Sequence, residues 1–266
     1  MFNTFAKTFL TNTVISGSIA IGSLLSFATV PVQAFQIFFG EDLNNNGSVP
    51  LPSFPNSSAA ESDFLSNLIG VGTEDFESFS AGTGSLIDLT FPGSTDDITA
   101  ILSGGGGTIQ SVPAGSTNEV GRYGTSPTNF FEVAAGGANN FQVNFDTPIA
   151  AFGFFGVDIG DFGGQLELEL ANGTTQIFTV PNEIGSSGST DGSILFYGVI
   201  AENASEIFQS VDFLTTTGGG DVFAFDDFTI GELEQVTNGG HTIPEPSLIL
   251  SLLAVGGLGS IMKLKR

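Results

Sequence analysis

Two segments of the chain alternate strictly between apolar and polar side chains. Phe141, Val143 and Phe145 are each separated by one polar residue, and the run at 166–170 places Leu at every second position with Glu between. Successive side chains of a strand point to opposite faces, so each segment predicts a strand with one buried and one solvated face.

Other runs are apolar at nearly every position. A strand without a polar face belongs in the middle of a sandwich or beneath another layer. Shorter segments between Gly-rich turns bring the total to about ten evenly spaced strands, which predicts an all-β, two-sheet, jelly-roll-like sandwich. The continuous runs are 149–157, 194–200 and 222–230, and the shorter strands are expected at 74–79, 86–91, 98–102, 129–133, 175–180 and 208–214.

A short arm precedes the sandwich. Residues 35–39 form a possible strand, and an Asn-, Gly- and Pro-rich stretch follows them. Ser58 and Glu61 then have the spacing of a capping box ahead of Phe64 and Leu65, which favours one short helix. The sequence therefore divides into an N-terminal arm at 35–72 and a β-sandwich domain at 73–237.

The first 34 residues have the pattern of a signal peptide. Lys7 is the only charge among them, and an apolar stretch follows from about residue 14 to residue 28. Val32, Gln33 and Ala34 form the small-residue ending that a signal peptidase reads, so cleavage is expected after Ala34. An uncleaved N-terminal anchor or a buried helix is the alternative.

The C-terminal region combines a proline motif, an apolar run and a basic end. Pro244, Glu245 and Pro246 precede the uncharged run 247–262, and three of the five basic residues of the chain follow it. The run predicts a transmembrane helix whose basic end stays in the cytoplasm. The order of these three elements within 238–266 closely resembles the PEP-CTERM sorting tail of exported bacterial proteins.

The resemblance implies a route for the protein. Proteins with such tails are transiently anchored in the inner membrane, and an exosortase is thought to cut them near the Pro-Glu-Pro site. They belong to bacteria that make extracellular polysaccharide, which makes that polymer a possible partner. The expected location is the cell surface or extracellular matrix. A permanent tail anchor without cleavage is the alternative.

Charge narrows the range of partners. Of the 28 acidic residues only Glu245 lies outside 35–243, which leaves 27 acids there against Arg122 alone. Such a chain repels phosphate backbones and anionic headgroups, so nucleic-acid and peripheral membrane binding are not expected. Divalent cations are the natural partners, and a halophile-like solvated surface is the alternative. The chain has no Cys and therefore no disulfide bonds.

Residues suited to catalysis are scarce. His241 is the only histidine and lies beside the sorting tail, and no Lys occurs between residues 8 and 262. The usual activated nucleophiles and bases are therefore missing, and we do not expect an enzyme. A glycoside hydrolase built on two carboxylates is a lesser alternative, because pairs of acids arise by chance in so acidic a chain.

Sugar binding is the stronger alternative. Jelly-roll sandwiches often stack sugars on exposed Trp or Tyr, but this chain has no Trp and two Tyr. Tyr197 lies in an apolar run and is expected in the core. Tyr123, beside Arg122 in a Gly-rich loop, is the possible sugar contact.

A calcium site is expected where the first strand of the sandwich domain meets its last. The body loosely resembles jelly rolls of the carbohydrate-binding type, which implies paired terminal strands and a structural Ca²⁺ held by acids there. Strict alternation sends Asp226 and Asp227 to opposite faces, and a buried carboxylate needs a metal or backbone donors. Solvated acids at strand ends are the alternative. The expected ligands are Glu74, Asp75, Glu77, Asp226 and Asp227, with a second candidate at Asp158 and Asp161.

These observations point to an exported protein with a structural or adhesive role in an extracellular polysaccharide layer. A lectin-like module is the alternative function.

Overall fold

A computed structural model describes residues 35–44, 46–134, 141–158, 164–181, 191–215 and 222–237. All of them belong to one compact unit, Gln33–Arg266. No helix within these ranges is long and apolar enough to cross a bilayer. The predicted signal peptide, the Pro-Glu-Pro motif and the predicted transmembrane run lie outside the described residues.

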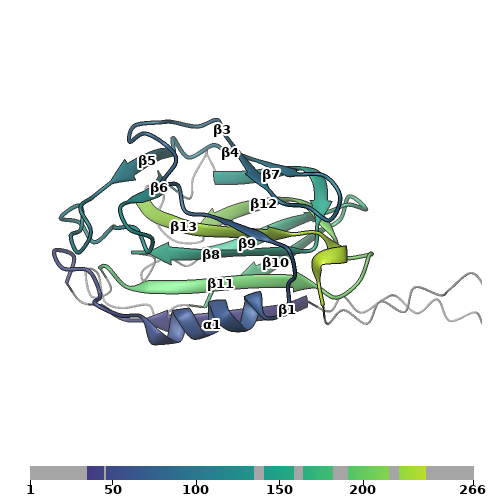
Figure 1. Ribbon diagram of the computed structural model, residues 1–266, viewed down its shortest axis with the longest axis horizontal. Helices are drawn as coiled ribbons and strands as arrows, with labels where there is room; N and C mark the ends of the chain where they lie inside the picture. Colours follow the sequence, from purple (N-terminus) through teal and green to yellow (C-terminus); the bar gives the residue numbers. More distant parts are fainter. Residues whose placement is uncertain are drawn as a thin grey trace, which may run out of the picture. The chain divides into compact units, whose positions relative to one another are not determined.

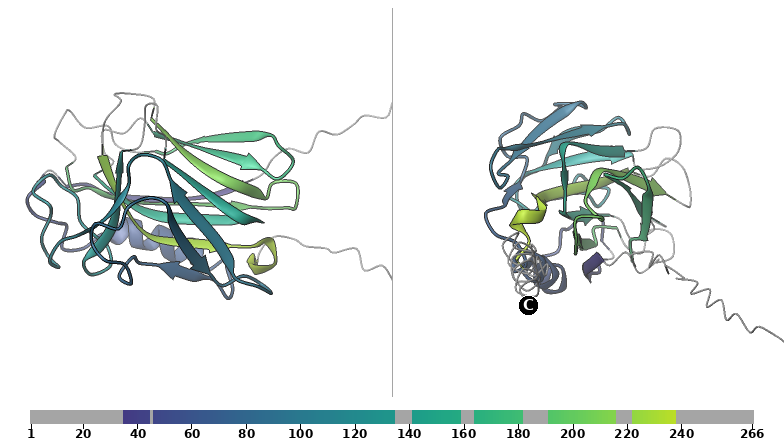
Figure 2. Two further views of the ribbon diagram at one scale, coloured as in Figure 1. Left: turned by 90° about the horizontal axis from the view of Figure 1, so that it is seen from above. Right: turned by 90° about the vertical axis from the view of Figure 1, so that its right-hand side faces the viewer.

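The described residues form two antiparallel sheets (Figures 1 and 2). The two-sheet, all-β sandwich expected from the sequence is therefore confirmed. The seven-stranded sheet has the order β1-β11-β8-β13-β6-β5, with β2 also paired to β13, and comprises β1 (Phe35–Asp42), β2 (Gly72–Glu74), β5 (Thr108–Ser111), β6 (Asn129–Ala134), β8 (Ala151–Val157), β11 (Ile194–Ala201) and β13 (Val222–Gly231). The six-stranded sheet has the order β10-β9-β12-β7-β4-β3 and comprises β3 (Ile87–Phe91), β4 (Ile98–Ser103), β7 (Phe141–Ile149), β9 (Gly164–Leu170), β10 (Thr175–Thr179) and β12 (Phe208–Thr215).

The main core fills the space between the two sheets. Leu166, Leu168 and Leu170 of β9 are fully buried, and the residues between them are partly exposed. β7 has the same alternation from Phe141 to Phe145. The six-stranded sheet thus has one apolar inner face and one polar outer face, as the alternating pattern predicted.

A second core lies on the other side of the seven-stranded sheet. The helix α1 (Pro55–Leu65) packs against β1, β11 and β8, and Figure 1 shows it along the lower border of the sheet. Phe64 of α1 is fully buried there beside Phe196. The continuous apolar runs are β8, β11 and β13, which are central strands of this doubly covered sheet.

A pair of glycines makes room for the helix. Gly153 and Gly198 lie directly opposite each other on β8 and β11. A Cβ atom would lie 2.7 Å from the Phe64 ring at Gly153 and 2.6 Å from it at Gly198. Both positions therefore need the bare backbone on which this ring rests.

The start of α1 differs from the expected capping box. The helix begins at Pro55, whose fixed φ suits the first helical position, so Ser58 lies inside it. The Asp42 carboxylate at the end of β1 instead accepts hydrogen bonds from the backbone N–H groups of Asn56 at 3.2 Å and Ser57 at 2.8 Å. The helix is capped by a residue from a neighbouring strand, which local sequence spacing does not reveal.

Two boundaries also differ from the sequence analysis. β1 is an edge strand of the seven-stranded sheet, so the region assigned to an N-terminal arm is part of the sandwich. The strand expected at 74–79 ends at Glu74, because its carboxylate accepts a 2.7 Å bond from the Phe76 N–H and closes a turn with Phe76 at φ 58°. A short 3₁₀ helix, Leu233–Gln235, follows β13.

Candidate metal centre at the first and last strands

β13 contains a β-bulge at the two aspartates. Its pairing with β8 shifts between Asp226 and Thr229, and Asp227 has a positive φ of 50°. Phe225 and Phe228 are three positions apart, yet both are buried in the core between the sheets. One extra residue in the strand makes this possible, because strict alternation would send them to opposite faces.

The bulge corrects the expected placement of the aspartates. Asp226 and Asp227 do not face opposite layers, since both carboxylates lie within hydrogen-bond distance of the one Thr125 hydroxyl, at 3.1 and 2.8 Å. Asn and Asp tolerate a left-handed backbone better than other side chains with a Cβ, which suits Asp227 to the bulged position.

Asp226 is fully buried and amply hydrogen-bonded. One of its oxygens accepts bonds from the backbone N–H groups of Thr125 at 2.8 Å and Ser126 at 3.0 Å. The other accepts the N–H of Asp227 at 2.9 Å. A buried carboxylate needs such donors. Backbone N–H donors therefore hydrogen-bond both oxygens of Asp226.

The two aspartates nevertheless lie in an unfavourable electrostatic setting. Burial, followed by the charge of Asp227, raises the pKa of Asp226 well above its usual range despite these hydrogen bonds. Burial also raises the pKa of Asp227, and the charges of Asp75 and Glu77 raise it further. The carboxylates around the bulge in β13 therefore repel one another.

The expected meeting of first and last strands is present. β2 pairs with β13 and places Glu74 opposite Phe228. Glu77, just beyond β2, accepts hydrogen bonds from the N–H groups of Thr128 at 2.7 Å and Asn129 at 2.6 Å. Burial opposes the ionised form of Glu77, but these bonds outweigh it and lower its pKa.

The other acids of the group have weaker support. Burial raises the pKa of Glu74, and the charge of Asp75 adds to this effect. Burial also raises the pKa of Glu61 on α1, and the charge of Asp227 contributes. Glu61, which sequence spacing assigned to a helix cap, is therefore influenced by the charge of Asp227.

The loop residues Thr125 and Ser126 were missed from the sequence. Their stretch, Gly-Thr-Ser-Pro-Thr at 124–128, has the composition of a turn rich in hydroxyl donors. Such a composition predicts local hydrogen bonds. It does not predict a carboxylate about a hundred positions away as the acceptor.

The geometry limits the number of carboxylate oxygens that could bind a metal ion. Within the described ranges, no three Asp, Glu or His side chains come together closely enough to hold a metal ion. Asp226 is occupied by N–H donors, and Glu77 holds two backbone N–H groups. The remaining carboxylate oxygens of the group belong chiefly to Asp75 and Asp227.

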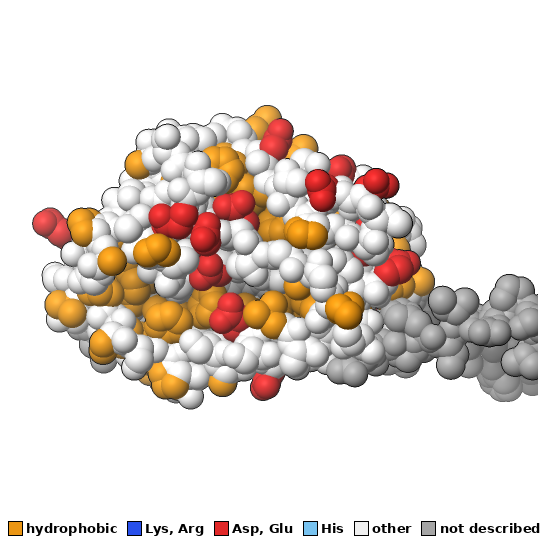
Figure 3. Space-filling model, in the orientation of Figure 1, with side chains coloured by type: hydrophobic (Ala, Val, Ile, Leu, Met, Phe, Trp, Pro, Cys, Tyr) orange, Lys and Arg blue, Asp and Glu red, His pale blue; other side chains and the backbone are white. Residues whose placement is uncertain are grey.

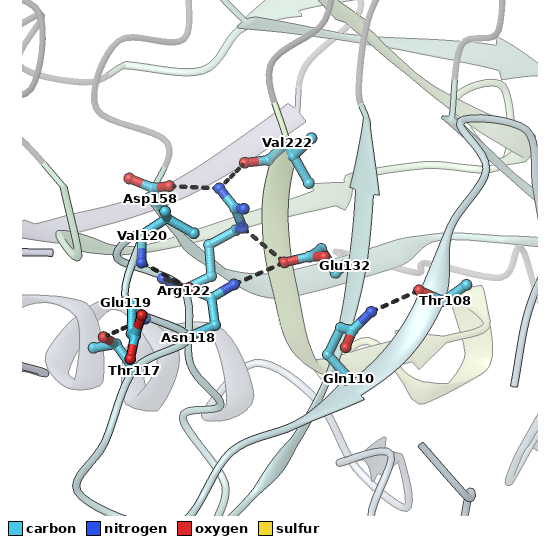
Figure 4. A network of polar contacts seen from close by, with 10 residues as sticks. All are labelled: Thr108, Gln110, Thr117, Asn118, Glu119, Val120, Arg122, Glu132, Asp158 and Val222. Carbon is cyan, nitrogen blue, oxygen red and sulfur yellow. Dashed lines mark hydrogen bonds and ion pairs between the residues drawn. The ribbon is translucent and has the colours of Figure 1, made fainter. Parts of the chain in front are cut away.

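The second metal candidate and the possible sugar contact meet in one polar network (Figure 4). Arg122 forms ion pairs with Glu132 at 2.7 Å and Asp158 at 3.1 Å and donates a hydrogen bond to the Val222 carbonyl. Asn118 also donates to Glu132. Asp158 thus has a cationic neighbour, so its surroundings require no metal. Its expected partner Asp161 lies outside the described residues.

Tyr123 lies in the core, which removes it as a stacking surface for sugars. The side chain is almost completely buried, and its hydroxyl donates to the Gly192 carbonyl at 2.8 Å and accepts from the Leu51 N–H at 3.1 Å. Burial raises the pKa of this phenol to about 12. Tyr197 is buried between the sheets, as expected. Arg122 and Tyr123 therefore tie loops to the sandwich.

Comparisons with known proteins reveal no family. No protein-family model matches the chain, and no curated protein matches it. Among solved structures, the K2 cleaved adhesin domain of Lys-gingipain has a TM-score of 0.36 at 14% identity, covering 60% of this chain and 97% of its own. The TmCBM61 structure in complex with β-1,4-galactotriose has a TM-score of 0.29 at 14% identity, covering 59% and 93%. Both scores are too low for either neighbour to inform the function of this chain.

Proposed function

We propose that the protein is an exported structural or adhesive component of an extracellular polysaccharide layer. The observation that carries the proposal is the charge distribution of the sandwich. Its one Arg is held in internal ion pairs, and Figure 3 shows scattered acidic side chains on one face without a basic one. A hydrated acidic surface of this kind suits a polymer matrix rather than nucleic acid or an anionic membrane.

A carbohydrate-binding module is the second candidate, and the open face of the six-stranded sheet favours it. The helix α1 packs on the other sheet. On the open face Gln142 donates to Asp212 at 2.9 Å, Asn144 donates to Gln142 at 2.9 Å, and Glu167 is paired across the strands with Asp212. Amide and carboxylate groups in such rows can bind sugar hydroxyls.

Pull-down of the full chain on a panel of acidic and neutral polysaccharides separates the two candidates. A lectin-like module retains one class of polymer and loses it in the double variant Glu167→Ala/Asp212→Ala. The control Glu234→Ala removes an exposed charge from the 3₁₀ helix. A passive matrix component binds no polymer selectively, and both variants then match the wild type.

A hydrolase is not favoured by this geometry. Asp226, whose pKa burial raises well above its usual range, is fully buried and hydrogen-bonded, so a glycosidic bond cannot reach it. Release of reducing sugar from any bound polymer would overturn this part of the proposal.

Export and sorting rest on the two ends of the sequence. We propose cleavage after Ala34 and exosortase processing near Pro244, Glu245 and Pro246, with transient anchoring in the inner membrane. Intact-mass analysis of the protein from its host should find neither 1–34 nor 247–266. A C-terminal peptide that ends at Arg266 in surface material would favour a permanent tail anchor.

A calcium ion remains a proposal for the acidic group around Asp227. The support is electrostatic, because burial and, after it, the charges of Asp75 and Glu77 raise the pKa of Asp227. Arg122, the one Lys or Arg residue of 35–243, is paired with Glu132 and Asp158. Oxygen donors favour Ca²⁺ over softer metals. The structure assigns no complete ligand set, so the expected affinity is weak. Thermal unfolding with calcium and with chelator tests it, since a ligand of the folded state raises the midpoint.

A further inference from the structure

The edge strand β1 is an open and unusually apolar sheet edge. Its sequence, Phe-Gln-Ile-Phe-Phe-Gly-Glu-Asp, carries no charge before Glu41. Ile37 is 41% exposed and Phe39 is 36% exposed, although both lie on a strand of the sandwich. Edge strands in monomers are usually guarded by Lys, Pro, bulges or inward charges, and the exposed part of β1 has none of these.

The backbone of this strand presents pairing groups outward. Ala201 of β11 donates its N–H to Ala150, which lies on the β8 side. Alternate residues of an antiparallel strand bond to opposite neighbours, so the even-numbered residues of β11 bond to β1. Their partners on β1 are Gln36, Phe38, Gly40 and Asp42.

It follows that Ile37 and Phe39 direct their N–H and C=O groups away from the sheet. The 3.1 Å bond from the Asn56 side chain to the Glu41 carbonyl agrees with this assignment, since Glu41 has the same parity. Within the described part of the chain, no hydrogen bond to the outward groups of Ile37 or Phe39 is found. The edge can therefore accept another strand.

The side chains of Ile37 and Phe39 lie on the face of β1 that is turned toward the six-stranded sheet. Phe35 is covered by Phe178 of β10, with ring centroids 5.1 Å apart. Ile37 and Phe39 lie further along the same face of β1 and remain partly exposed, whereas their partners Val199 and Tyr197 on β11 are buried. The apolar inner face of the seven-stranded sheet is therefore partly exposed at its edge strand, β1.

We propose that β1 pairs with β1 of a second copy of this chain, in antiparallel orientation, to form a continuous sheet across a dimer. A register centred on Phe38 places Ile37 opposite Phe39 of the second copy, and Phe39 opposite its Ile37. Both pairs use outward backbone groups, and both fall on the same apolar face, which joins aromatic to β-branched side chains. The twofold relation is the one expected of an isologous interface.

Charge favours this orientation. The acidic end of β1, Glu41 and Asp42, lies at opposite ends of an antiparallel interface, whereas parallel pairing would place the acids side by side. In the proposed register Glu41 faces Phe35 of the second copy. Where cleavage after Ala34 takes place, Phe35 carries the positively charged amino terminus, so opposite charges meet there. The dimer does not depend on polysaccharide binding.

Sedimentation velocity of the exported protein, with its native ends, is the first test. Residues 35–243 carry 27 acids against Arg122 alone, so two copies repel each other, and the dimer fraction should rise with protein concentration and with NaCl, which screens the charge. Ile37→Pro removes an outward N–H without removing a bond to β11 and should raise the dimer dissociation constant at least tenfold. A monomer at all salt and protein concentrations would overturn the proposal.

A matched pair of charge variants tests whether the loss of the dimer is specific to β1. Ile37→Glu should abolish the dimer, while Leu86→Glu, at a position 71% exposed near β3, should leave it unchanged. Equal effects of the two variants would contradict the proposal. A cooperative thermal unfolding transition in each variant shows that it is folded.

Cross-linking tests the register, because the chain has no native Cys. The double variant Ile37→Cys/Phe39→Cys should give a disulfide-linked dimer on oxidation, since opposed residues lie within disulfide range. Either single variant should give far less of it. Equal cross-linking by the single variants would overturn the register. Thiols protected from reagent in a monomer would mean that another segment of the same chain covers β1, and would overturn the dimer.

Discussion

The two sheets of this sandwich are built from the same kinds of residues but have different surroundings. The six-stranded sheet buries one face and leaves the other polar, so its strands alternate. The central strands of the seven-stranded sheet are buried on both faces, because α1 and its neighbouring loops form a third layer. The difference shows that the pattern of apolar and polar residues along a strand indicates whether one face or both faces of its sheet are covered.

The difference between the two sheets also explains where a polar group destabilises the fold unless the protein itself supplies its hydrogen bonds. On the open face, Asp212 and Gln142 are partly exposed and can exchange their partners with water. In the covered sheet, Asp226 is fully buried and needs a donor from the protein for each oxygen. The same residue type is therefore a surface group in one sheet and a fixed structural element in the other.

The largest expected effect is the loss of the ring that joins the third layer to the covered sheet. Phe64→Ala leaves a cavity above Gly153 and Gly198 and should lower the free energy of unfolding by about 3–5 kcal/mol. Chemical denaturation of the full chain measures it. The matched change Ile177→Ala, at a residue 46% exposed on β10, should cost far less. Similar losses at the two positions would mean that the helix contributes little to stability.

The inner face of the six-stranded sheet should respond next. Leu168→Ala and Phe145→Ala each remove a buried side chain of the main core and should cost about 2–5 kcal/mol. Phe145 is 9% exposed, so the loss of free energy in Phe145→Ala should lie at the lower end of this range. Denaturant midpoints of both variants provide the measurement. A cost below that of an exposed residue would place these side chains outside the core.

The glycine pair beneath α1 should tolerate no side chain. Gly198→Ala places a methyl group against the Phe64 ring and should cost about 1–3 kcal/mol through overpacking. A smaller ring partner should relieve the clash, so Gly198→Ala combined with Phe64→Leu should be more stable than the sum of the two single changes. A double-mutant cycle measures this coupling. Strict additivity would show that the contact is not strained.

Removal of one charge at the bulge should stabilise the protein. Asp227→Asn keeps an acceptor for Thr125, suits the positive φ and removes a charge from the acidic group. In chelator at neutral pH the free energy of unfolding should rise by about 0.5–1 kcal/mol, the scale of a relieved like-charge contact on a sheet. If calcium binds here, the variant should also lose the response of its thermal midpoint to calcium.

The Asp227→Asn variant should also differ from the wild type in how its stability depends on pH. Folding raises the pKa of Asp227, so its ionised form opposes folding at neutral pH, and stability recovers as the pH falls through the folded pKa toward the unfolded one. Glu77 has the opposite sign, because its pKa is lowered and its contribution is lost as the pH falls through that lower value. Unfolding measured from neutral to acidic pH should therefore show a flatter rise in Asp227→Asn. An identical slope in the two proteins would exclude the charge effect.

The smallest effect is expected on the open face of the six-stranded sheet. Gln142→Ala removes a hydrogen bond to the partly exposed Asp212, and water can replace it. The free energy of unfolding should change by less than about 0.5 kcal/mol. A loss comparable to that of Leu168→Ala would mean that this face is covered in solution.

The sequence by itself predicted most of the strands and their two kinds, but it missed β5 and extended the strand at 74–79 beyond its end at Glu74. The apolar and polar alternation at 166–170 and the uninterrupted apolar run at 194–200 are local patterns. The polarity of each residue in them indicates whether its own side chain is buried. A short helix was also predicted, from the capping-box spacing of Ser58 and Glu61 ahead of Phe64 and Leu65. Its cap was not, because the capping Asp42 belongs to a strand.

Tertiary structure alone decided how the polar residues are satisfied. The acceptor of Thr125 and Ser126 is Asp226, about a hundred positions along the chain, and the bulge that aims it depends on Phe225 and Phe228 both filling the core. Arg122 gained its partners in the same way, from strands that only folding brings beside it. Burial is encoded residue by residue, but a hydrogen bond between distant segments exists only after the sheets have packed.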